Sequence, residues 1–321
     1  MRDPDALRGY SYELFGLQVR SELALPELIE AEDGAEADVA IRMGQVDAPA
    51  GDDAGLYPHD GAFVLVVPDV ARFRIEQGRT ITIEPAPGAP EPNVRLFLLG
   101  SAFGALLHQK GLLPLHANAV EIDGRAFAFV GRSGEGKSTL AAWFHDQGYR
   151  VIADDVCVVG FDDDGVPYAM PGLPRLRLCR EALEATGRDA DSYARSYAGR
   201  EDFDKFDVPL SVPGIAGERL ALAAIYLLER GEGVEISPIK GIAAAETIFA
   251  NTYRGRYVSF LGSAQPHYQA CLELVRKTPL FALRRSWNLE RLGAEANKIV
   301  AHAKNHSASW NARGAKGEVG R

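Results

Sequence analysis

The segment that decides the fold is Gly131-Arg132-Ser133-Gly134-Glu135-Gly136-Lys137-Ser138, which fits the pattern G-x-x-x-x-G-K-[S/T] at every fixed position. An apolar run, Ala126–Val130, precedes it, and a helical pattern over Ser138–Gln147 follows it. The glycines allow a turn tight enough for consecutive N–H groups to point inward. The sequence therefore predicts a strand, a phosphate-binding loop and a helix in succession.

Each polar residue of this loop has an expected role at a nucleotide. Lys137 would neutralise the β- and γ-phosphates, and the Ser138 hydroxyl would ligate Mg²⁺. Main-chain N–H groups and the positive end of the helix would bind the phosphate oxygens. The plain alternative is a glycine-rich turn that binds nothing. We predict a site for ATP and Mg²⁺ formed by Gly131, Arg132, Ser133, Gly134, Glu135, Gly136, Lys137, Ser138 and Thr139.

A second feature is a pair of carboxylates. The apolar segment Tyr149–Ala153 ends directly in Asp154 and Asp155. Carboxylates at a strand end beside a phosphate loop commonly serve the metal, and one of two can instead accept the proton of an attacking hydroxyl. The alternative is that the pair caps a turn, as aspartate often does.

Several of these features occur together in one known family. His116, the hairpin through Asp123-Gly124, the loop Gly131–Ser138 and the strand ending in Ala153-Asp154-Asp155 resemble, in order and spacing, the catalytic domain of HPr kinase/phosphorylase. The core of that family is similar to that of phosphoenolpyruvate carboxykinase. The resemblance covers about residues 112–160. It implies an α/β P-loop fold and transfer of the γ-phosphoryl group of ATP to a serine hydroxyl.

The resemblance also assigns roles to particular side chains. Asp154 would be the general base that deprotonates the serine, Asp155 would support the metal and the loop, and His116 would lie beside the active site. Taken alone, a strand histidine is more often a core residue with a single hydrogen bond. Lys137 and Ser138 keep the roles already given.

The chain departs from the family after the paired aspartates. The family carries a signature close to E-I-R-G-L-G, whereas this chain has Pro171–Leu178. The segments Tyr12–Leu17 and Leu99–Gly104 resemble a divergent branch that accompanies ribosomally made peptides, including lasso-peptide precursors. The resemblance therefore implies a serine on a peptide or small protein as acceptor. A kinase of free serine-like alcohols and a non-catalytic nucleotide-sensing module remain open.

Four arginines could contribute to substrate binding. Arg175, Arg177, Arg254 and Arg256 could clamp a phosphate or a peptide carboxylate, because a guanidinium group binds either one bidentately. Arginines are also common on solvated surfaces, so these residues could equally have no such role.

Patterning divides the chain into three parts. Residues 1–93 are expected to form a small β-rich domain, because short alternating segments such as Arg79–Glu84 are separated by turn residues. The proline-rich stretch Pro85–Pro92 reads as a linker. Residues 94–304 are expected to form the catalytic domain, with a helix over Val94–Gln109 and a mobile loop over Glu184–Lys205. The polar residues 305–321 are expected to be a disordered tail.

The composition argues against several other classes of protein. A net charge of -9 argues against a protein that coats nucleic acid, though not against a nucleotide site built from backbone amides. The three cysteines form no C-x-x-C pair, so neither a disulfide framework nor a zinc site is indicated. The apolar stretches are too short for a membrane span, and Met1–Asp5 lacks the apolar core of a signal peptide. We expect a cytoplasmic protein without membrane or nucleic-acid partners, and the resemblance leaves a homo-oligomer open.

Overall fold

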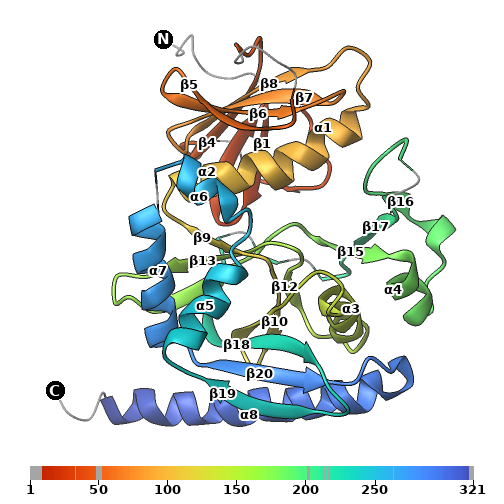
Figure 1. Cartoon of the computed structure of the whole chain (residues 1–321), viewed down its shortest axis with the longest axis vertical. Coiled ribbons are helices and arrows are strands. Elements are labelled where there is room, and N and C mark those ends of the chain that lie inside the picture. Colours follow the sequence, from red (N-terminus) through yellow and green to blue (C-terminus); the bar gives the residue numbers. More distant parts are fainter. Residues whose placement is uncertain are drawn as a thin grey trace.

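A computed structural model describes residues 9–317, apart from 33, 48–52, 201–202, 213, 216 and 263. Residues 1–8, which include the segment used to judge a signal peptide, lie outside this range. Two large sheets form the body of the molecule, one above the other in the view of Figure 1. The expectation of a mixed α/β fold is confirmed.

The N-terminal sheet contains eight strands in the order β3-β1-β2-β4-β8-β7-β6-β5. Its strands alternate between buried and half-exposed residues, as in β7, where Ala71, Phe73 and Ile75 are buried. The β-rich character predicted for this region is therefore observed. The bounds are β1 Tyr10–Leu14, β2 Leu17–Ser21, β3 Ile29–Glu30, β4 Val39–Met43, β5 Gly55–His59, β6 Ala62–Val67, β7 Ala71–Glu76 and β8 Thr80–Pro85.

A helical segment covers this sheet and shares its core. It comprises α1 Glu91–Phe97, the π-helical turn η1 Leu98–Ala102 and α2 Phe103–Gln109. Its apolar side chains pack with those of β7 and β8 in one continuous cluster. A boundary at residue 93, as predicted, would cut through this cluster. The last proline of the stretch Pro85–Pro92 lies in the first turn of α1, a position that proline favours.

The second sheet has nine strands, with β12-β10-β11-β18-β14-β13-β9 as its main path and β20 and β19 added beside β18. Strand β18 pairs in parallel with β11 and β20 and is buried along most of its length, which explains its nearly unbroken apolar sequence. The bounds are β9 Leu113–Leu115, β10 Ala117–Ile122, β11 Arg125–Val130, β12 Val151–Ala153, β13 Cys157–Phe161, β14 Pro167–Met170, β18 Leu220–Arg230, β19 Glu235–Ile239 and β20 Leu280–Arg285.

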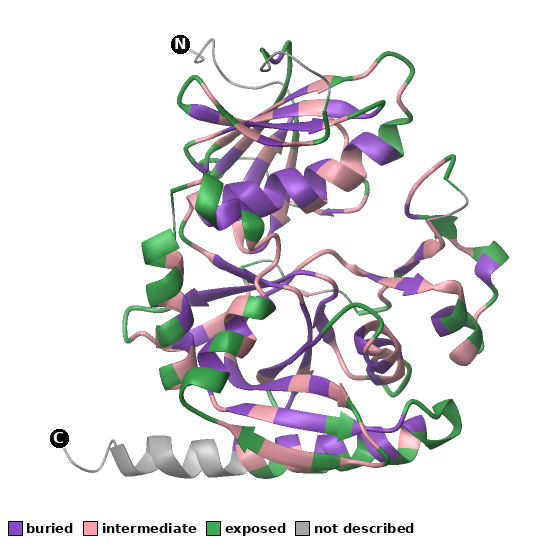
Figure 2. Cartoon of the chain, in the orientation of Figure 1, coloured by how far each residue is buried: buried purple, intermediate pink, exposed green. Residues whose placement is uncertain are grey.

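Helices cover both faces of this sheet, and the buried residues concentrate between the layers (Figure 2). Helices α3 Lys137–Asp146 and α8 Leu292–Gly317 pack in one cluster, whereas α5 Ile242–Ala250 and α7 Ala264–Lys277 pack in the other. The short helix α6 Arg256–Phe260 lies near α2. The hairpin at Asp123-Gly124 has φ values of 51° and 73°, as the predicted type I′ turn requires.

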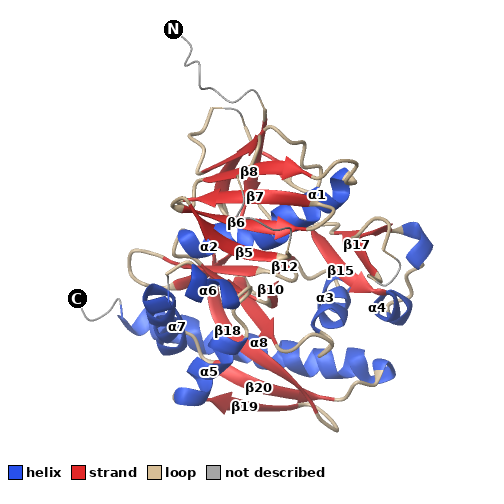
Figure 3. Ribbon diagram, turned by 45° about the horizontal axis from the view of Figure 1, so that its top comes forward, coloured by secondary structure: helices blue, strands red, loops and turns tan. Residues whose placement is uncertain are grey.

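A small three-stranded sheet stands beside α3 (Figure 3). It contains β15 Arg175–Cys179, β16 Ala194–Arg195 and β17 Lys205–Pro209. Helix α4 Arg180–Ala185 and the 3-10 turn η2 Ala190–Ser192 connect β15 to β16. The predicted mobile loop over Glu184–Lys205 is thus largely structured, because its charged residues form ion pairs and a turn capped by Asp189.

The C-terminal segment also differs from its prediction. After the 3-10 turn η3 Leu289–Arg291, helix α8 continues to Gly317, through most of the tail predicted from residue 305. Extending an anchored helix adds one hydrogen bond per residue, and the buried Ile299 and Ala303 anchor this one. No helix in the described part of the chain combines the length and hydropathy that a membrane span requires.

The shared core of the N-terminal sheet and α2 can be tested with Phe103→Ala. Phe103 is fully buried, with its ring 6.5 Å from that of Phe15. Removing the ring leaves a cavity, so the free energy of unfolding should fall by about 3–5 kcal/mol in urea denaturation. Phe260→Ala, at a ring that is 55% exposed in α6, is the matched control and should change it far less. Equal effects of the two substitutions would contradict this description of the core.

Candidate active site

The predicted order of strand, loop and helix is present at residues 125–146. Strand β11 ends at Val130, and α3 begins at Lys137 after a cap at Gly136 with φ of +77°. A Cβ atom on Gly136 would lie 2.3 Å from Nη2 of Arg285. The backbone conformation therefore favours glycine at this position, and a side chain here would also displace the end of Arg285.

Side chains from distant elements hold the loop in place. The Gly131 N–H donates to Oδ1 of Asn251, at 2.9 Å. The Lys137 ammonium donates to the carbonyls of Gly131 and Arg132, at 2.7 and 3.0 Å. Asn251, which follows α5, also accepts the His116 N–H through its own carbonyl oxygen. Asn251 thereby links the loop to the histidine, a connection that residue spacing does not reveal.

A cavity of about 380 Å³ lies over this loop. It is lined by loop and α3 residues together with side chains of β10, β15, α4 and β20. Of the predicted site residues, His116, Ser133, Gly134, Gly136, Lys137, Ser138, Thr139 and Asp155 line it. Four others are not among the described residues that line it, namely Gly131, Arg132, Glu135 and Asp154.

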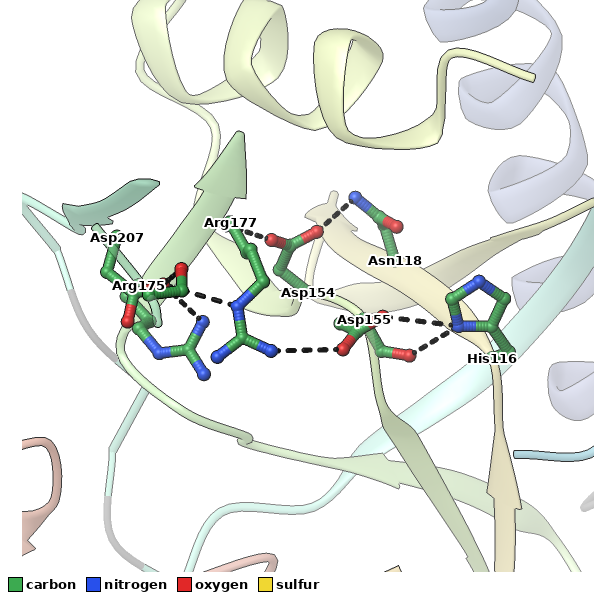
Figure 4. Close-up of polar contacts among 8 residues, drawn as sticks. His116, Asn118, Asp154, Asp155, Arg175, Arg177 and Asp207 are labelled. Atoms are coloured by element: carbon green, nitrogen blue, oxygen red, sulfur yellow. Dashed lines mark hydrogen bonds and ion pairs between the residues drawn. The ribbon is translucent and has the colours of Figure 1, made fainter. Parts of the chain in front are cut away.

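Asp154 is buried in the protein and is only 6% exposed. Its Oδ1 accepts from the Asn118 amide at 2.7 Å, and its Oδ2 accepts from the Arg177 main-chain N–H (Figure 4). Burial raises the pKa of this carboxyl to about 6, although the hydrogen bond from Arg177 lowers it. The family resemblance implied that Asp154 is the general base, and Asp154 is not among the described residues that line this cavity.

Asp155 is the carboxylate that faces the cavity. Its φ of +72° is in the left-handed region, which a non-glycine residue seldom adopts and which aspartate tolerates best. One side-chain oxygen lies 3.3 Å from Nδ1 of His116, and the other lies 3.5 Å from Nη1 of Arg177. Burial opposes ionisation, but the hydrogen bond from His116 and the charge of Arg177 hold the pKa of Asp155 well below its usual range.

Two buried cations meet at the loop. Burial lowers the pKa of Lys137, and the charges of Asp155 and Asp154 oppose that shift. Arg285, at the end of β20, is 4% exposed, lines the cavity and donates through Nη2 to the Gly136 carbonyl at 3.2 Å. Its Nε has no hydrogen-bond partner among the described residues. Sequence reasoning missed Arg285, whose only signal was an Arg-Arg pair at the end of a strand far from the loop motif.

The residues present fit a nucleotide with Mg²⁺ rather than a metal held by protein alone. The described residues contain no cluster of three or more His, Cys, Asp or Glu side chains suited to a metal ion. Mg²⁺ in nucleotide sites needs no such cluster, because it keeps several waters and binds one or two protein groups plus phosphate oxygens. Ser138 and Asp155, the two predicted metal ligands, both line the cavity.

No protein-family model matches the chain, and no curated protein sequence matches it. Among solved structures, the Hpr(Ser) kinase/phosphatase from Coxiella burnetii is similar in structure, with a TM-score of 0.33 and 10% sequence identity. The match covers 65% of this chain and 98% of that one.

The buried charge of Asp154 predicts a specific pH dependence of stability. A carboxyl with a pKa raised to about 6 binds more protons in the folded chain than in the unfolded chain, so its contribution to stability falls as pH rises from about 4 to 6. Asp154→Asn removes this titration. Relative to wild type, the variant should therefore gain up to about 3 kcal/mol in unfolding free energy between pH 4 and pH 7.

Urea denaturation at several pH values would measure this difference. Asp163→Asn, at an exposed turn residue, is the matched control and should follow the wild type across the same range. A constant difference between wild type and Asp154→Asn would show that the Asp154 carboxylate is not buried.

Proposed function

We propose that this chain is an ATP-dependent kinase that transfers the γ-phosphoryl group to a serine hydroxyl of a peptide or small protein. The observation that carries the proposal is that Lys137, Ser138 and Asp155 face one cavity above a strand–loop–helix turn. A cation, a hydroxyl and an ionised carboxylate in that arrangement match the requirements of phosphoryl transfer.

The loop would bind the phosphates. The N–H groups around Gly134 and Gly136 and the first turn of α3 supply donors and the positive end of a helix dipole. Lys137 would turn its ammonium group from the loop carbonyls toward the β- and γ-phosphates, which would favour its charged form. Arg285 contacts the same turn and would add a second cation on the side of β20.

ATP would supply the phosphoryl group, and the Ser138 hydroxyl would help to hold Mg²⁺, which would neutralise phosphate charge. In the transfer, a bond forms between the acceptor oxygen and the γ-phosphorus, while the bond from that phosphorus to the bridging oxygen breaks and ADP leaves. Asp155 would orient the hydroxyl and take its proton as the new bond forms. Its lowered pKa keeps Asp155 ionised and able to accept a hydrogen bond from the acceptor hydroxyl, and positioning would supply much of the acceleration.

Two further residues would position Asp155. His116 and Arg177 bind its two side-chain oxygens from opposite sides and so fix the direction of the carboxylate. Asp154, the residue first expected to be the base, would serve this arrangement indirectly. Its hydrogen bonds to Asn118 and to the Arg177 main chain fix the end of β12 against β15.

The acceptor is proposed from the sequence resemblance, which suggests a ribosomally made peptide such as a lasso-peptide precursor. The alternatives are a free serine-like alcohol and a nucleotide-sensing module without transfer. Assays of phosphate transfer from labelled ATP to serine peptides and to free serine would separate the two kinases. Tight ATP binding without transfer to any of them would favour the sensing module.

Two substitutions separate nucleotide binding from chemistry. Lys137→Ala removes a cation next to the phosphates and should weaken ATP binding by about tenfold or more. Asp155→Asn keeps the shape of the side chain but cannot accept the proton, so ATP should still bind while transfer falls by about 100-fold or more. Calorimetry would measure binding, and release of ADP, with water or a serine peptide as acceptor, would measure transfer.

Lys298→Ala, at an exposed residue of α8, is the control for removal of a lysine. It should leave both readouts unchanged. Full transfer by Asp155→Asn together with loss of transfer by Asp154→Asn would return the base to Asp154, and failure of the wild type to bind ATP with Mg²⁺ would reject the kinase.

A further inference from the structure

A second and larger cavity, of about 740 Å³, lies between the N-terminal part of the chain and the small sheet. Helix α1 and the segment before β3 form one wall, and β15, β16 and β17 form the other. Its volume is within the range of about 300–1,000 Å³ usual for small-ligand sites. Its charged lining residues are Glu27, Arg95, Arg175, Arg177, Arg195 and Asp207, and most of the others are apolar.

The two cavities meet at one residue, because Arg177 lines both. In Figure 4, a row of polar side chains runs from His116 through Asp155 and Arg177 to Asp207. Nε of Arg177 lies 3.3 Å from Asp207, and its Nη1 lies 3.5 Å from Asp155. A molecule in the larger cavity that extends past Arg177 would therefore reach the carboxylate proposed to accept the proton.

The walls of the larger cavity carry more positive than negative charge. Four arginines and two carboxylates, Glu27 and Asp207, line it. Glu27 is paired with Arg95, at 2.8 Å, which leaves Asp207 as the lining carboxylate beside Arg175 and Arg177. A single Asp207 oxygen accepts from both guanidinium groups and from the Ser196 hydroxyl.

Arg175 has a carboxylate partner but one unpaired nitrogen. Its side chain is 12% exposed, Nη1 lies 3.0 Å from Asp207, and its buried Nε has no hydrogen-bond partner among the described residues. Burial lowers the pKa of this guanidinium and Arg177 lowers it further, while the charges of Asp207, Asp154 and Asp155 oppose the shift. A carboxylate next to Arg175 would supply the acceptor that Nε lacks.

The remaining lining is apolar. Leu96 and Leu99 face the cavity from the helical segment, with Ile29, Pro174 and Leu210 around them. Water next to these side chains is best displaced by hydrocarbon, so the preferred ligand would combine an apolar body with one anionic group.

We propose that this cavity binds the phosphoryl acceptor, and that the acceptor is an apolar molecule with a carboxylate held by Arg175 and a hydroxyl directed past Arg177 to Asp155. The inference rests on the proposed kinase function. Such an acceptor could be a free hydroxy acid or a peptide segment with a carboxylate near its serine. The same chemistry would recognise both.

Binding of two matched pairs of probes tests the proposal. The first pair is 10-hydroxydecanoate and its methyl ester, and the second is an acetylated leucine- and serine-containing tetrapeptide as the free acid and as the amide. Each acid should bind the wild type about tenfold or more tightly than its uncharged partner, a difference of about 1.4 kcal/mol. A preference within one pair alone identifies which source the cavity accepts.

Two variants test whether the carboxylate of the ligand binds Arg175 and whether its apolar part lies against Leu96. Arg175→Met keeps the apolar stem and should reduce the preference for the acid to under about twofold. Leu96→Trp, on the opposite wall, should weaken acid and uncharged partner alike without touching the Asp207 contacts. Arg276→Met, at a residue of α7 whose side chain is 70% exposed, is the matched control and should behave as the wild type.

ATP binding, measured on the same samples, separates this inference from the kinase proposal. The wild type and all three variants should bind ATP equally. Equal binding of acid and uncharged partner, no binding of either pair, or a preference that survives in folded Arg175→Met would overturn the assignment of the cavity. Acid-selective binding without any ATP binding would keep the cavity as a ligand site and reject the kinase.

Discussion

The end of β12 is the constraint on which the site depends. Asp154 and Asp155 follow directly after β12, which ends at Ala153, and their side chains lie in different surroundings. Asp154 points into the protein and Asp155 turns outward through a left-handed backbone step. This unusual conformation persists because His116 and Arg177 hold the Asp155 carboxylate from both sides.

The left-handed backbone conformation at Asp155 also explains why the two aspartates have different pKa values. Asp154 receives hydrogen bonds from an amide and a main-chain N–H, which do not offset its loss of solvent, so its pKa rises to about 6. Asp155 lies against a histidine and a guanidinium group, and its pKa falls. A pKa near neutrality would suit a general base, but Asp154 is not among the described residues that line the cavity, whereas Asp155 is.

Sequence reasoning predicted the elements with strong local signals. The strand before the loop, the helix after it and the hairpin at Asp123-Gly124 each depend on nearby glycines and apolar periodicity, and all three are present. The direction of Asp154, the contact of Arg285 with Gly136 and the link through Asn251 depend on side chains brought together by the sheet. No local pattern encodes such contacts, and the sequence could not have revealed them.

The division between the two parts of the chain also depends on long-range packing. Prolines at residues 85–92 suggested a linker, yet the helix that follows shares its core with the N-terminal sheet. That helix presents Leu96 and Leu99 to the cavity opposite Arg175, so the N-terminal part contributes a wall beside the proposed catalytic centre. The Asp207 side chain joins Arg175 to Arg177, and Arg177 contacts Asp155. A charge bound next to Arg175 would therefore act on Asp155 through Asp207 and the Arg177 guanidinium group. The N-terminal sheet therefore supports the helix that would select the acceptor, and it would be a structural part of the proposed site.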